Sequence, residues 1–450
     1  MAAQILPFSA SKLPAPSPIA RYLRVGEAHQ QLANLYAGGR LSADRTVIYA
    51  SRFRHQREFV TALRDAESQI VLDTEAAELA APARYAGHAR YAPWALPDAT
   101  GPLGPNHFRD PALNVVSQIA RFAVASGFDT VLAPSHFLGD PACDDWLTVD
   151  TESCRALRSV LDREGGRHIG IDYPLIAPST MLNEHATRQV IISSLSDLPI
   201  NNVWIRVSGL GADAGPLVLR RYLESLSQFQ SLGKPLIADY LGGFAGMAAL
   251  ALGAVSGLAQ GAGERERFDA DQWHKPSPPR KEGSRFGRVV RINMPGLQGS
   301  VTREELVLLV SARGGRCLCA CGDRSCCLNG YDDMRKDPRG HGTRQQSKAL
   351  SALEKVHDLR RPSYFLEGPL KDSERLARNL EALRPSQTEA SDQRVNLDTL
   401  MSRLRDRRRR FDGVGKVLRQ MNEQRGGEWP RARAVTPKAS FGPLFRQNRP

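Results

Sequence analysis

Between residues 45 and 312 the chain alternates short apolar runs with amphipathic segments. Each run is rich in β-branched side chains and nearly continuous in apolar residues, as expected for parallel strands covered on both faces. The segments between the runs have helical periodicity. The runs are residues 46–51, 69–74, 130–135, 168–173, 202–208, 234–240 and 289–294, with a weaker one near 255–259. Eight such units predict an α/β protein with a (β/α)8 barrel of the TIM type, and an open doubly wound sheet is the alternative.

The open sheet has less support, because no GxGxxG sequence follows the first run and no Walker A motif occurs. Outside the barrel we expect three further parts. Residues 1–44 form an N-terminal extension with a Pro-, Ser- and Ala-rich lead and one helix over 20–36. Residues 313–385 carry a cysteine cluster and closing helices, and residues 386–450 form a polar, basic tail that is partly helical or disordered.

Charge is concentrated in that tail. The formal net charge is +13, and residues 401–450 contain 14 Lys and Arg against 4 Asp and Glu, which is +10. Apolar residues recur there at helical spacing, so an amphipathic helix with a basic face is predicted. We interpret that face as a nucleic-acid interface: Arg403, Arg405, Arg407, Arg408, Arg409 and Arg410. The alternatives are a helix that docks on the barrel, an anionic membrane, a partner helix or a solvated tail.

Nothing in the composition indicates a membrane protein. The most apolar stretch, residues 247–258, is far shorter than the roughly 18 residues of a membrane span. The first residues do not have the charged start, apolar core and cleavage site of a secretory signal. We therefore expect a cytoplasmic protein with reduced thiols and no membrane partner.

Five of the seven cysteines lie between Cys317 and Cys327, directly after the last predicted strand. Arg, Asp and Gly residues interleave them, which argues against simple packing in a core. Reduced thiolates at this density, followed by a histidine, predict a structural zinc site.

Polar residues occupy the ends of the predicted strands, where the chemistry of a barrel collects. They are Asp73, His136, Asp172, Arg206, Ser208, Asp239 and Glu264. Carboxylates converging on one mouth can act as acid, base or nucleophile. Four glycines, Gly209, Gly211, Gly242 and Gly243, would let a ligand approach the backbone. Each residue alone also has a structural interpretation, as a helix cap, a loop anchor or a turn residue.

Together these features resemble the tRNA-guanine transglycosylases (queuine tRNA-ribosyltransferases), including relatives that install deazaguanine bases in DNA. The resemblance covers roughly residues 45–360. It is carried by the cysteine-rich site after the final strand, by Asp73 at the end of the second strand, and by two glycine-rich segments. VSGLGADAG is similar to a glycine-rich loop of the family, and YLGGFAGMAALALGAV is laid out like the segment before its seventh strand.

The resemblance implies exchange of a guanine-type base, in queuosine or 7-deazaguanine chemistry, at a glycosidic bond in tRNA or DNA. Asp73 and Asp172 would then contact the base and transfer protons. The family's nucleophilic aspartate has no counterpart in residues 250–260, so Asp239 or Glu264 would take its role. His136, Arg206, Ser208 and the glycines would bind substrate.

The resemblance also implies a zinc ligand set of Cys319, Cys321, Cys326 and His341. Cys317 and Cys327 are then spare, Cys317 could replace Cys321 or Cys326, and His357 is the alternative histidine. A homodimer or a partner subunit is also implied. Two other functions remain open: a non-catalytic nucleic-acid-binding barrel that has lost the nucleophile, and an unrelated barrel hydrolase acting on a small molecule.

Overall fold

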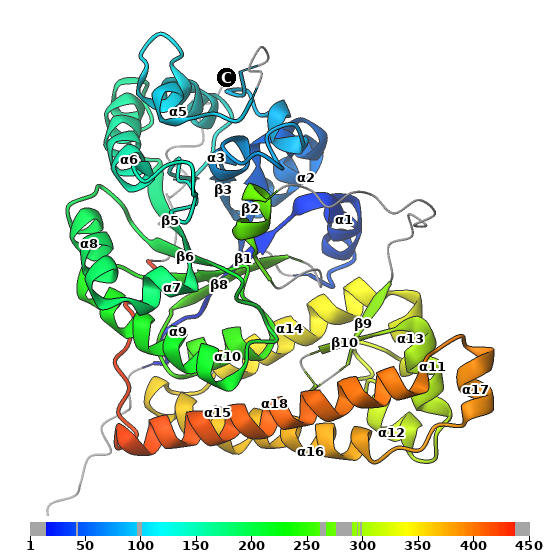
Figure 1. Ribbon diagram of the computed structural model, residues 1–450. Helices are drawn as coiled ribbons and strands as arrows, with labels where there is room; N and C mark the ends of the chain where they lie inside the picture. The colour runs from blue at the N-terminus through cyan, green and yellow to red at the C-terminus, as the bar shows by residue number, and fades with distance from the viewer. Residues whose placement is uncertain are drawn as a thin grey trace, which may run out of the picture.

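The computed structural model describes residues 15–41, 44–96, 101–261, 267–275, 290–294, 296–297 and 299–436. Eight parallel strands close into a barrel in chain order (Figure 1). They are β1 (Ala20–Arg24), β2 (Arg45–Tyr49), β3 (Gln69–Asp73), β4 (Thr130–Leu132), β5 (Gly170–Pro178), β6 (Val203–Ser208), β7 (Leu236–Asp239) and β8 (Gly257–Gly261). The predicted (β/α)8 barrel is confirmed, and the open-sheet alternative is wrong.

Two strand predictions need correction. The barrel begins with β1, inside the predicted N-terminal extension, and β1 closes the barrel by pairing with both β2 and β8. The helix expected over residues 20–36 begins only at His29, as α1 (His29–Ala37). The run at 289–294 is not a barrel strand: it is β9 (Arg291–Met294), which pairs antiparallel with β10 (Gly299–Thr302). The strand was missed because Arg24, a charged residue, occupies an inward position of β1 and interrupts its apolar pattern.

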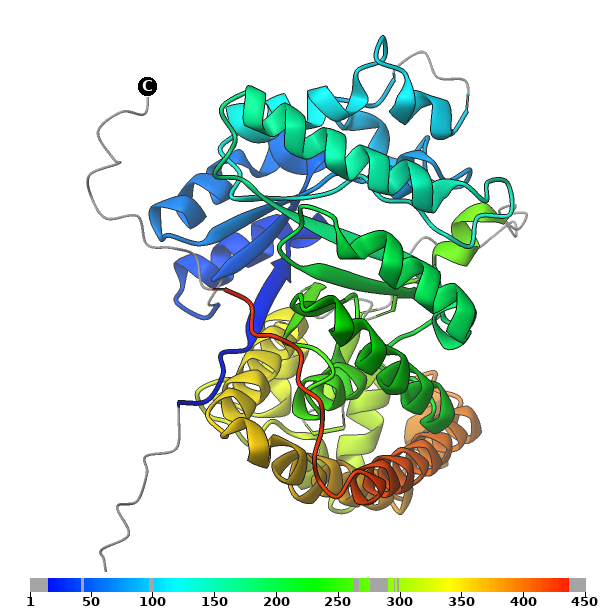
Figure 2. The same ribbon diagram turned by 90° about the vertical axis from the view of Figure 1, so that its left-hand side faces the viewer.

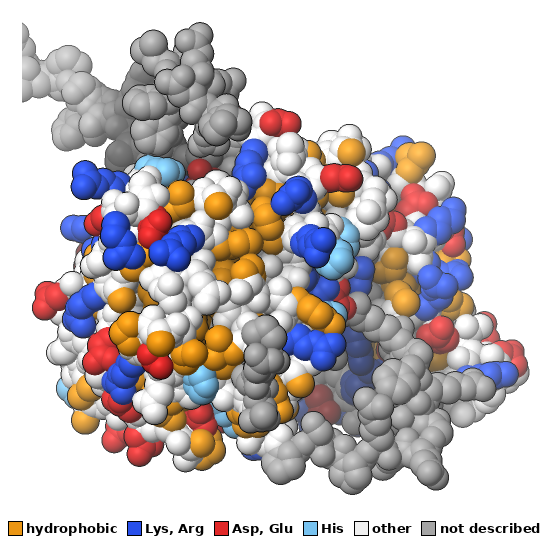
Figure 3. Space-filling view, turned by 90° about the horizontal axis from the view of Figure 1, so that it is seen from above, with side chains coloured by type: hydrophobic (Ala, Val, Ile, Leu, Met, Phe, Trp, Pro, Cys, Tyr) orange, Lys and Arg blue, Asp and Glu red, His pale blue; other side chains and the backbone are white. Residues whose placement is uncertain are grey.

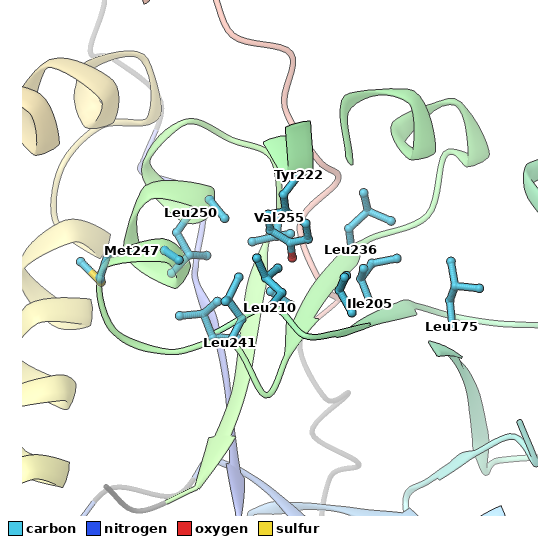
Figure 4. Close-up of a cluster of buried hydrophobic side chains, with 14 of the residues drawn as sticks. Leu175, Ile205, Leu210, Tyr222, Leu236, Leu241, Met247, Leu250 and Val255 are labelled. Atoms are coloured by element: carbon cyan, nitrogen blue, oxygen red, sulfur yellow. The ribbon is translucent and has the colours of Figure 1, made fainter. Parts of the chain in front are cut away.

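Helices cover the outside of the barrel. They are α2 (Phe53–Asp65), α3 (Ala76–Leu79), α4 (Pro105–Arg109), α5 (Val115–Ala125), α6 (Trp146–Arg163), α7 (Ser179–Asn183), α8 (His185–Ser196), α9 (Pro216–Phe229) and α10 (Gly243–Ala251), with the short 3-10 helix η5 (Ala270–His274) after β8. Figure 4 shows part of the core between strands and helices, where Ile205 and Leu236 face Tyr222 and Leu250. All four side chains are buried.

The remaining helices form a second layer with β9 and β10 on one side of the barrel (Figure 1). They are α11 (Arg303–Ser311), α12 (Gly315–Cys319), α13 (Tyr331–Lys336), α14 (Pro338–Glu354), α15 (Arg361–Glu367), α16 (Pro369–Glu381), α17 (Gln387–Asp392) and α18 (Leu397–Gln424). Among the helices of the described residues, none has the length and apolar character needed to cross a bilayer.

The basic tail is an integral part of this layer. The predicted amphipathic helix is α18, and its apolar stripe belongs to the main core. The helix packs on α16, α15 and the barrel helix α9, and Phe411 meets Phe244 of α10 with ring centroids 5.3 Å apart. A Cβ atom on Gly413 would lie 2.7 Å from Pro216 Cγ, so this glycine permits the close contact with α9. The helix therefore docks on the barrel, as one of the alternatives predicted.

After α18 the chain returns to the barrel. Figure 2 shows this segment, in red, running from the helical layer toward β1. The backbone N–H of Ala432 donates to Gly253 O at 2.9 Å, in the loop before β8. Val435 is buried against residues of the barrel interior, including Ala20 and Trp204. The C-terminal segment thus covers the end of the barrel where the strands begin.

Replacing Phe411 by alanine tests whether α18 belongs to the fold. We expect a loss of about 3–5 kcal/mol in the free energy of unfolding, because a buried aromatic side chain would leave a cavity against α10. Arg409→Ala is the matched control, since that side chain is 67% exposed and we expect a change within about 0.5 kcal/mol. Urea unfolding followed by circular dichroism measures both. Equal stability of the two variants would show that α18 is not part of the cooperative unit.

Candidate active site and candidate metal centre

Four charged side chains form a closed ring of ion pairs near the carboxyl ends of the barrel strands. Arg24, at the end of β1, binds both oxygens of Asp239 at 2.6 Å and Asp73 Oδ2 at 2.8 Å. Arg206, on β6, binds Asp239 Oδ2 at 2.5 Å and Asp73 Oδ2 at 2.8 Å. Each of the four residues is only 2% exposed. This ion-pair ring joins β1, β3, β6 and β7 across the barrel interior.

The ring is electrically balanced, because two guanidinium groups face two carboxylates. Burial alone would raise the pKa of Asp73, but Arg206 and Arg24 outweigh it and lower this pKa to about 2. Asp73 is therefore ionised at neutral pH. The two aspartates differ in how many of their oxygens accept hydrogen bonds from arginine. Both oxygens of Asp239 accept from arginines, whereas Asp73 Oδ1 accepts, among the described residues, only the backbone N–H of Glu75, at 3.1 Å.

Two tyrosines lie against the ring. The hydroxyls of Tyr49 and Tyr240 are 2.6 Å apart, and Arg24 Nη1 donates to Tyr49 at 3.1 Å. The Arg24 guanidinium also lies over the Tyr240 ring, 4.3 Å from its centroid. Burial raises the pKa of both tyrosines, so each remains a neutral phenol. Tyr240 has a φ of 57°, a strained value for a non-glycine residue of the kind that concentrates at functional sites.

The loop after β3 supplies two further carboxyl groups. Glu75, with a φ of 54°, accepts hydrogen bonds from the Ser51 backbone at 2.7 Å and the Ser51 hydroxyl at 2.8 Å. Burial, with Glu78 second, raises the pKa of Glu75 to about 8. Burial and then the charge of Asp73 raise the pKa of Glu78, whose Oε2 is buried without a partner. An ionised Asp73 thus lies two residues from a carboxyl that stays protonated at neutral pH, an arrangement suited to acid–base chemistry.

Asp172 does not join this group, which corrects its predicted place at the mouth. Its oxygens accept from Asn202 Nδ2 and Trp204 Nε1, both at 2.8 Å. Trp204 and Arg206 are successive inward positions on β6, so Asp172 lies one layer deeper in the barrel than the ring. Burial raises the pKa of Asp172 to about 7, although the hydrogen bonds from Trp204 and Asn202 oppose this.

His136 also points elsewhere. Its Nδ1 lies 2.6 Å from Asp150 on α6, and its ring stacks on Trp146 with centroids 3.8 Å apart. The partners of His136 are therefore on the outer helix α6, and the residue anchors the loop after β4, which was the structural alternative.

The predicted residues after β6 and β7 are held by their neighbours. The Ser208 hydroxyl donates to Asp271 at 2.5 Å, and Gly209 N–H donates to Phe268 O at 2.9 Å, so both contact the segment around η5. Gly211 forms a β-bridge with Arg267 in the same segment. Gly242 is the N-cap of α10 and Gly243 is its first residue, with a φ of 55°. Glu264 lies outside the described residues.

Sequence reasoning missed Arg24, Tyr49, Glu75, Glu78 and Tyr240. A signal for Arg24 was present in the alternation of Ala20, Tyr22 and Arg24, which places all three on the inner face of one strand. The other four follow or end strands that were correctly predicted. Their importance depends on burial and on charges from other strands, which the sequence does not display.

Four side chains after the barrel form a candidate metal centre: Cys321, Cys326, Cys327 and His341. Their ligand atoms all lie within 4.8 Å of one another. His341 Nδ1 is 3.5 Å from Cys326 Sγ and 3.3 Å from Cys327 Sγ, and the two sulfurs are 3.7 Å apart. His341 lies in the first turn of α14. Three cysteines and a histidine converging in this way can hold a metal ion.

The surroundings of His341 prepare it as a ligand. Its Nε2 lies 3.0 Å from the carbonyl oxygen of Asn293 on β9, so the ring proton sits on Nε2 and the lone pair of Nδ1 faces the sulfurs. Burial lowers the pKa of His341, which favours the neutral imidazole that metals require. Gln345 Nε2 lies 3.3 Å from Cys321 Sγ, where it can donate to a bound thiolate.

The predicted ligand set is wrong at one position, because Cys327 takes the place of Cys319. Cys319 ends α12 with its side chain in the apolar core, where burial raises the pKa of its thiol to about 12. Cys317 is exposed. The alternative histidine, His357, accepts from Leu359 N at the start of a 3-10 helix. The spacing of the cysteines did not reveal this, because α12 ends at Cys319 and the backbone is extended at Ala320, so Cys319 and Cys321 lie in different local structures.

No protein-family model and no curated protein sequence matches the chain. Solved structures that resemble it include KGPDC from Streptococcus mutans, with 12% identity and a TM-score of 0.32 over 57% of this chain and 94% of that chain. Type I 3-dehydroquinate dehydratase from Clostridium difficile, with covalently modified comenic acid, has 9% identity and a TM-score of 0.34 over 57% and 90% of the two chains. Likenesses this weak carry no argument about activity or substrate.

Single cysteine substitutions test the metal centre. We expect Cys327→Ser to lose most of the bound metal, and exposed Cys317→Ser to keep about one equivalent per chain. Cys319→Ala should keep the metal while losing stability, because it removes a buried core side chain. Elemental analysis of the purified variants measures the metal. Retention in Cys327→Ser together with loss in Cys319→Ala would restore the ligand set expected from the sequence.

The raised pKa of Glu75 predicts a pH-dependent stability. A carboxyl whose pKa is higher in the folded than in the unfolded protein contributes stability that is present below the unfolded pKa, about 4.3, and is lost as the pH rises through about 8. Gln is neutral at every pH. We therefore expect the free energy of unfolding of Glu75→Gln, relative to that of the wild type, to rise by roughly 1–3 kcal/mol from pH 5 to pH 9. Urea unfolding at both pH values measures the gain. Glu58→Gln, at an exposed position, is the control, and its difference in stability from the wild type should be the same at both pH values. If the difference for Glu75→Gln is also independent of pH, Glu75 is not held protonated.

Proposed function

We propose that the protein is a transglycosylase-like enzyme that exchanges or handles a guanine-type base in tRNA or DNA. The observation that carries the proposal is the contrast between Asp73, whose pKa is lowered to about 2, and Glu75, whose pKa is raised to about 8, in one loop at the catalytic end of a TIM barrel. Breaking a glycosidic bond needs such a pair, a carboxylate for the anomeric carbon and an acid for the leaving group. The sequence resemblance to tRNA-guanine transglycosylases supports the substrate class.

In this proposal Asp73 is the nucleophile, in place of the Asp239 or Glu264 suggested by the sequence. Asp73 Oδ1 carries no arginine, whereas Asp239 accepts three charge-assisted hydrogen bonds and serves as the anchor of the ring. Oδ1 bonds to C1′ as the C1′–N bond breaks, and the electron pair of that bond leaves with the base. The departing base takes a proton from Glu75 or Glu78. The incoming base then bonds to C1′, its proton passes to the same carboxylate, and Asp73 is released.

We also propose that the metal ion is zinc in a structural role. Four protein ligands leave no open coordination position, and a set of three cysteines and one histidine is typical of structural zinc. Zinc–sulfur bonds of about 2.3 Å place tetrahedral sulfurs about 3.8 Å apart, close to the 3.7 Å between Cys326 and Cys327. The ion would tie the segment between α12 and α13, which carries the three cysteines, to α14 and β9 through His341 and Asn293.

A non-catalytic nucleic-acid-binding barrel is the second candidate. The observation that favours it is the burial of the ring, with both oxygens of Asp239 engaged and every ring residue 2% exposed. A carboxylate in such pairs is stabilised in its resting state, which lowers its reactivity. In that case the ring would stabilise the barrel and the protein would bind without turnover.

A base-exchange assay separates the two candidates. Labelled guanine is incubated with purified protein and with separate pools of tRNA and duplex DNA, and polymer-bound label is counted. We expect incorporation into one pool, and Glu75→Gln should reduce it about 100-fold because it removes the proton donor without changing the charge at neutral pH. Asp172→Asn, which makes a similar change one layer deeper, should retain activity. Binding to either pool without incorporation by the wild type would favour the non-catalytic protein.

A further inference from the structure

Apart from the outward-facing Arg409, the arginines of α18 form two sets that differ in how far acidic partners neutralise their charge. Those directed toward α16 have acidic partners: Arg405 and Arg408 pair with Glu381, and Arg419 pairs with Glu374. The second set, Arg403, Arg407 and Arg410, recurs at spacings of four and three residues, so it shares one face of the helix. In Figure 1 the first half of α18 passes close to α11 and β10. The three arginines of the first set face three acidic groups, because Arg408 also pairs with Asp412. In the second set only Arg403 has an acidic partner among the described residues.

Arg407 is the centre of the second set. Its Nη2 donates to Ser300 O at 3.3 Å, but its Nη1 is buried and has no hydrogen-bond partner among the residues that the structure describes. A Cβ atom on Gly299 would lie 2.7 Å from Arg407 Cζ, so the guanidinium fills the space that glycine leaves. Burial, followed by the charges of Arg410 and Arg403, lowers the pKa of Arg407 to about 10. A buried guanidinium with an unpaired N–H among like charges is costly unless an anion compensates it.

Within the described part of the chain, the acidic groups near Arg407 supply too little negative charge for this. Glu305 is the acidic group that acts on Arg407, and it is already engaged, because it accepts Thr302 N–H at 2.9 Å and pairs with Arg403. Arg291 of β9 adds a fourth positive charge to the same place. Among the described residues, neither Arg291 nor Arg410 has an ion pair with an acid. Four arginines and one glutamate give this region a net charge of +3.

We propose that Arg291, Arg403, Arg407 and Arg410, here called the arginine cluster, form an oxyanion site that takes a phosphate group. Arg407 forms its floor, and the exposed Arg291 and Arg403 form its rim. Planar guanidinium groups match phosphate oxygens with two parallel N–H donors each, and a phosphate offers enough oxygens for several arginines at once. The phosphate is a backbone phosphodiester of the polynucleotide if the proposed function holds, and free phosphate is the other source of the same chemistry.

The face of the molecule seen in Figure 3 fits this role less well. On the face seen in Figure 3, the described Lys and Arg side chains are interspersed with acidic and apolar ones, and the view shows no stripe of one sign. Arg409, next to the arginine cluster in sequence, faces outward with its side chain 67% exposed, 3.9 Å from Asp406. Arg409→Gln is therefore a matched control for Arg407→Gln, with the same chemical change on the same helix.

Two measurements test the site without requiring base exchange. The first is thermal unfolding with and without inorganic phosphate, against sodium chloride of equal ionic strength. We expect phosphate to raise the Tm of the wild type and of Arg409→Gln but not of Arg407→Gln. Arg407→Gln should fold at least as well as the wild type, because it removes an uncompensated charge. If phosphate raises the Tm of Arg407→Gln as much as that of the wild type, the site is refuted.

The second measurement is fluorescence anisotropy with labelled RNA and DNA oligonucleotides over a series of salt concentrations. Arg407→Gln should weaken binding about 10-fold and reduce the slope of log K against log salt by about 1, whereas Arg409→Gln should change affinity less than about twofold. Stabilisation by phosphate without an effect of Arg407→Gln on oligonucleotide binding would identify free phosphate as the ligand. If Arg407→Gln changes neither phosphate stabilisation nor oligonucleotide binding, the proposal is wrong, whatever the base-exchange assay shows.

Discussion

Two arginines and two aspartates can be buried in this barrel only because each charge meets opposite charges within hydrogen-bonding distance. The ion-pair ring uses residues from β1, β3, β6 and β7, so those four strands must hold a common register for any of the charges to be compensated. Removing one member would leave a buried charge without a partner, which is among the most destabilising changes in a protein interior. The ring therefore constrains both the closure of the barrel and the position of the carboxyl groups at its mouth.

The same ring explains the contrast between neighbouring carboxyl groups. Asp73 faces both arginines and is held ionised, whereas Glu75 is turned toward Ser51 and has no arginine bonded to it. Burial acts on both residues, so the contrast comes from the partners and not from the depth. A left-handed backbone at Glu75 separates the two environments within three residues of chain. The chemistry proposed for the barrel mouth depends on this local turn.

Distant parts of the chain complete the barrel. The tail contributes α18 to the core through Phe411, and Val435 then covers the end where the strands begin. The metal centre lies in the same second layer, where His341 connects α14 to β9 through the carbonyl of Asn293. Because α18 also carries the arginine cluster, that proposed phosphate site is held by the same packing that completes the barrel.

The sequence by itself determined most of the architecture: seven of the barrel strands, the amphipathic basic helix and the presence of a cysteine and histidine centre after the barrel. These depend on local periodicity and on residue type, which a single chain displays. Tertiary structure decided the rest. It placed Arg24 inside the barrel and Asp172 one layer below the mouth. It also brought Cys327, and not Cys319, to the metal centre, and gave acidic partners to some arginines of α18 but not to Arg407. Each of these outcomes depends on which groups from remote strands and helices come within a few ångströms of one another, and that proximity exists only after the chain has folded.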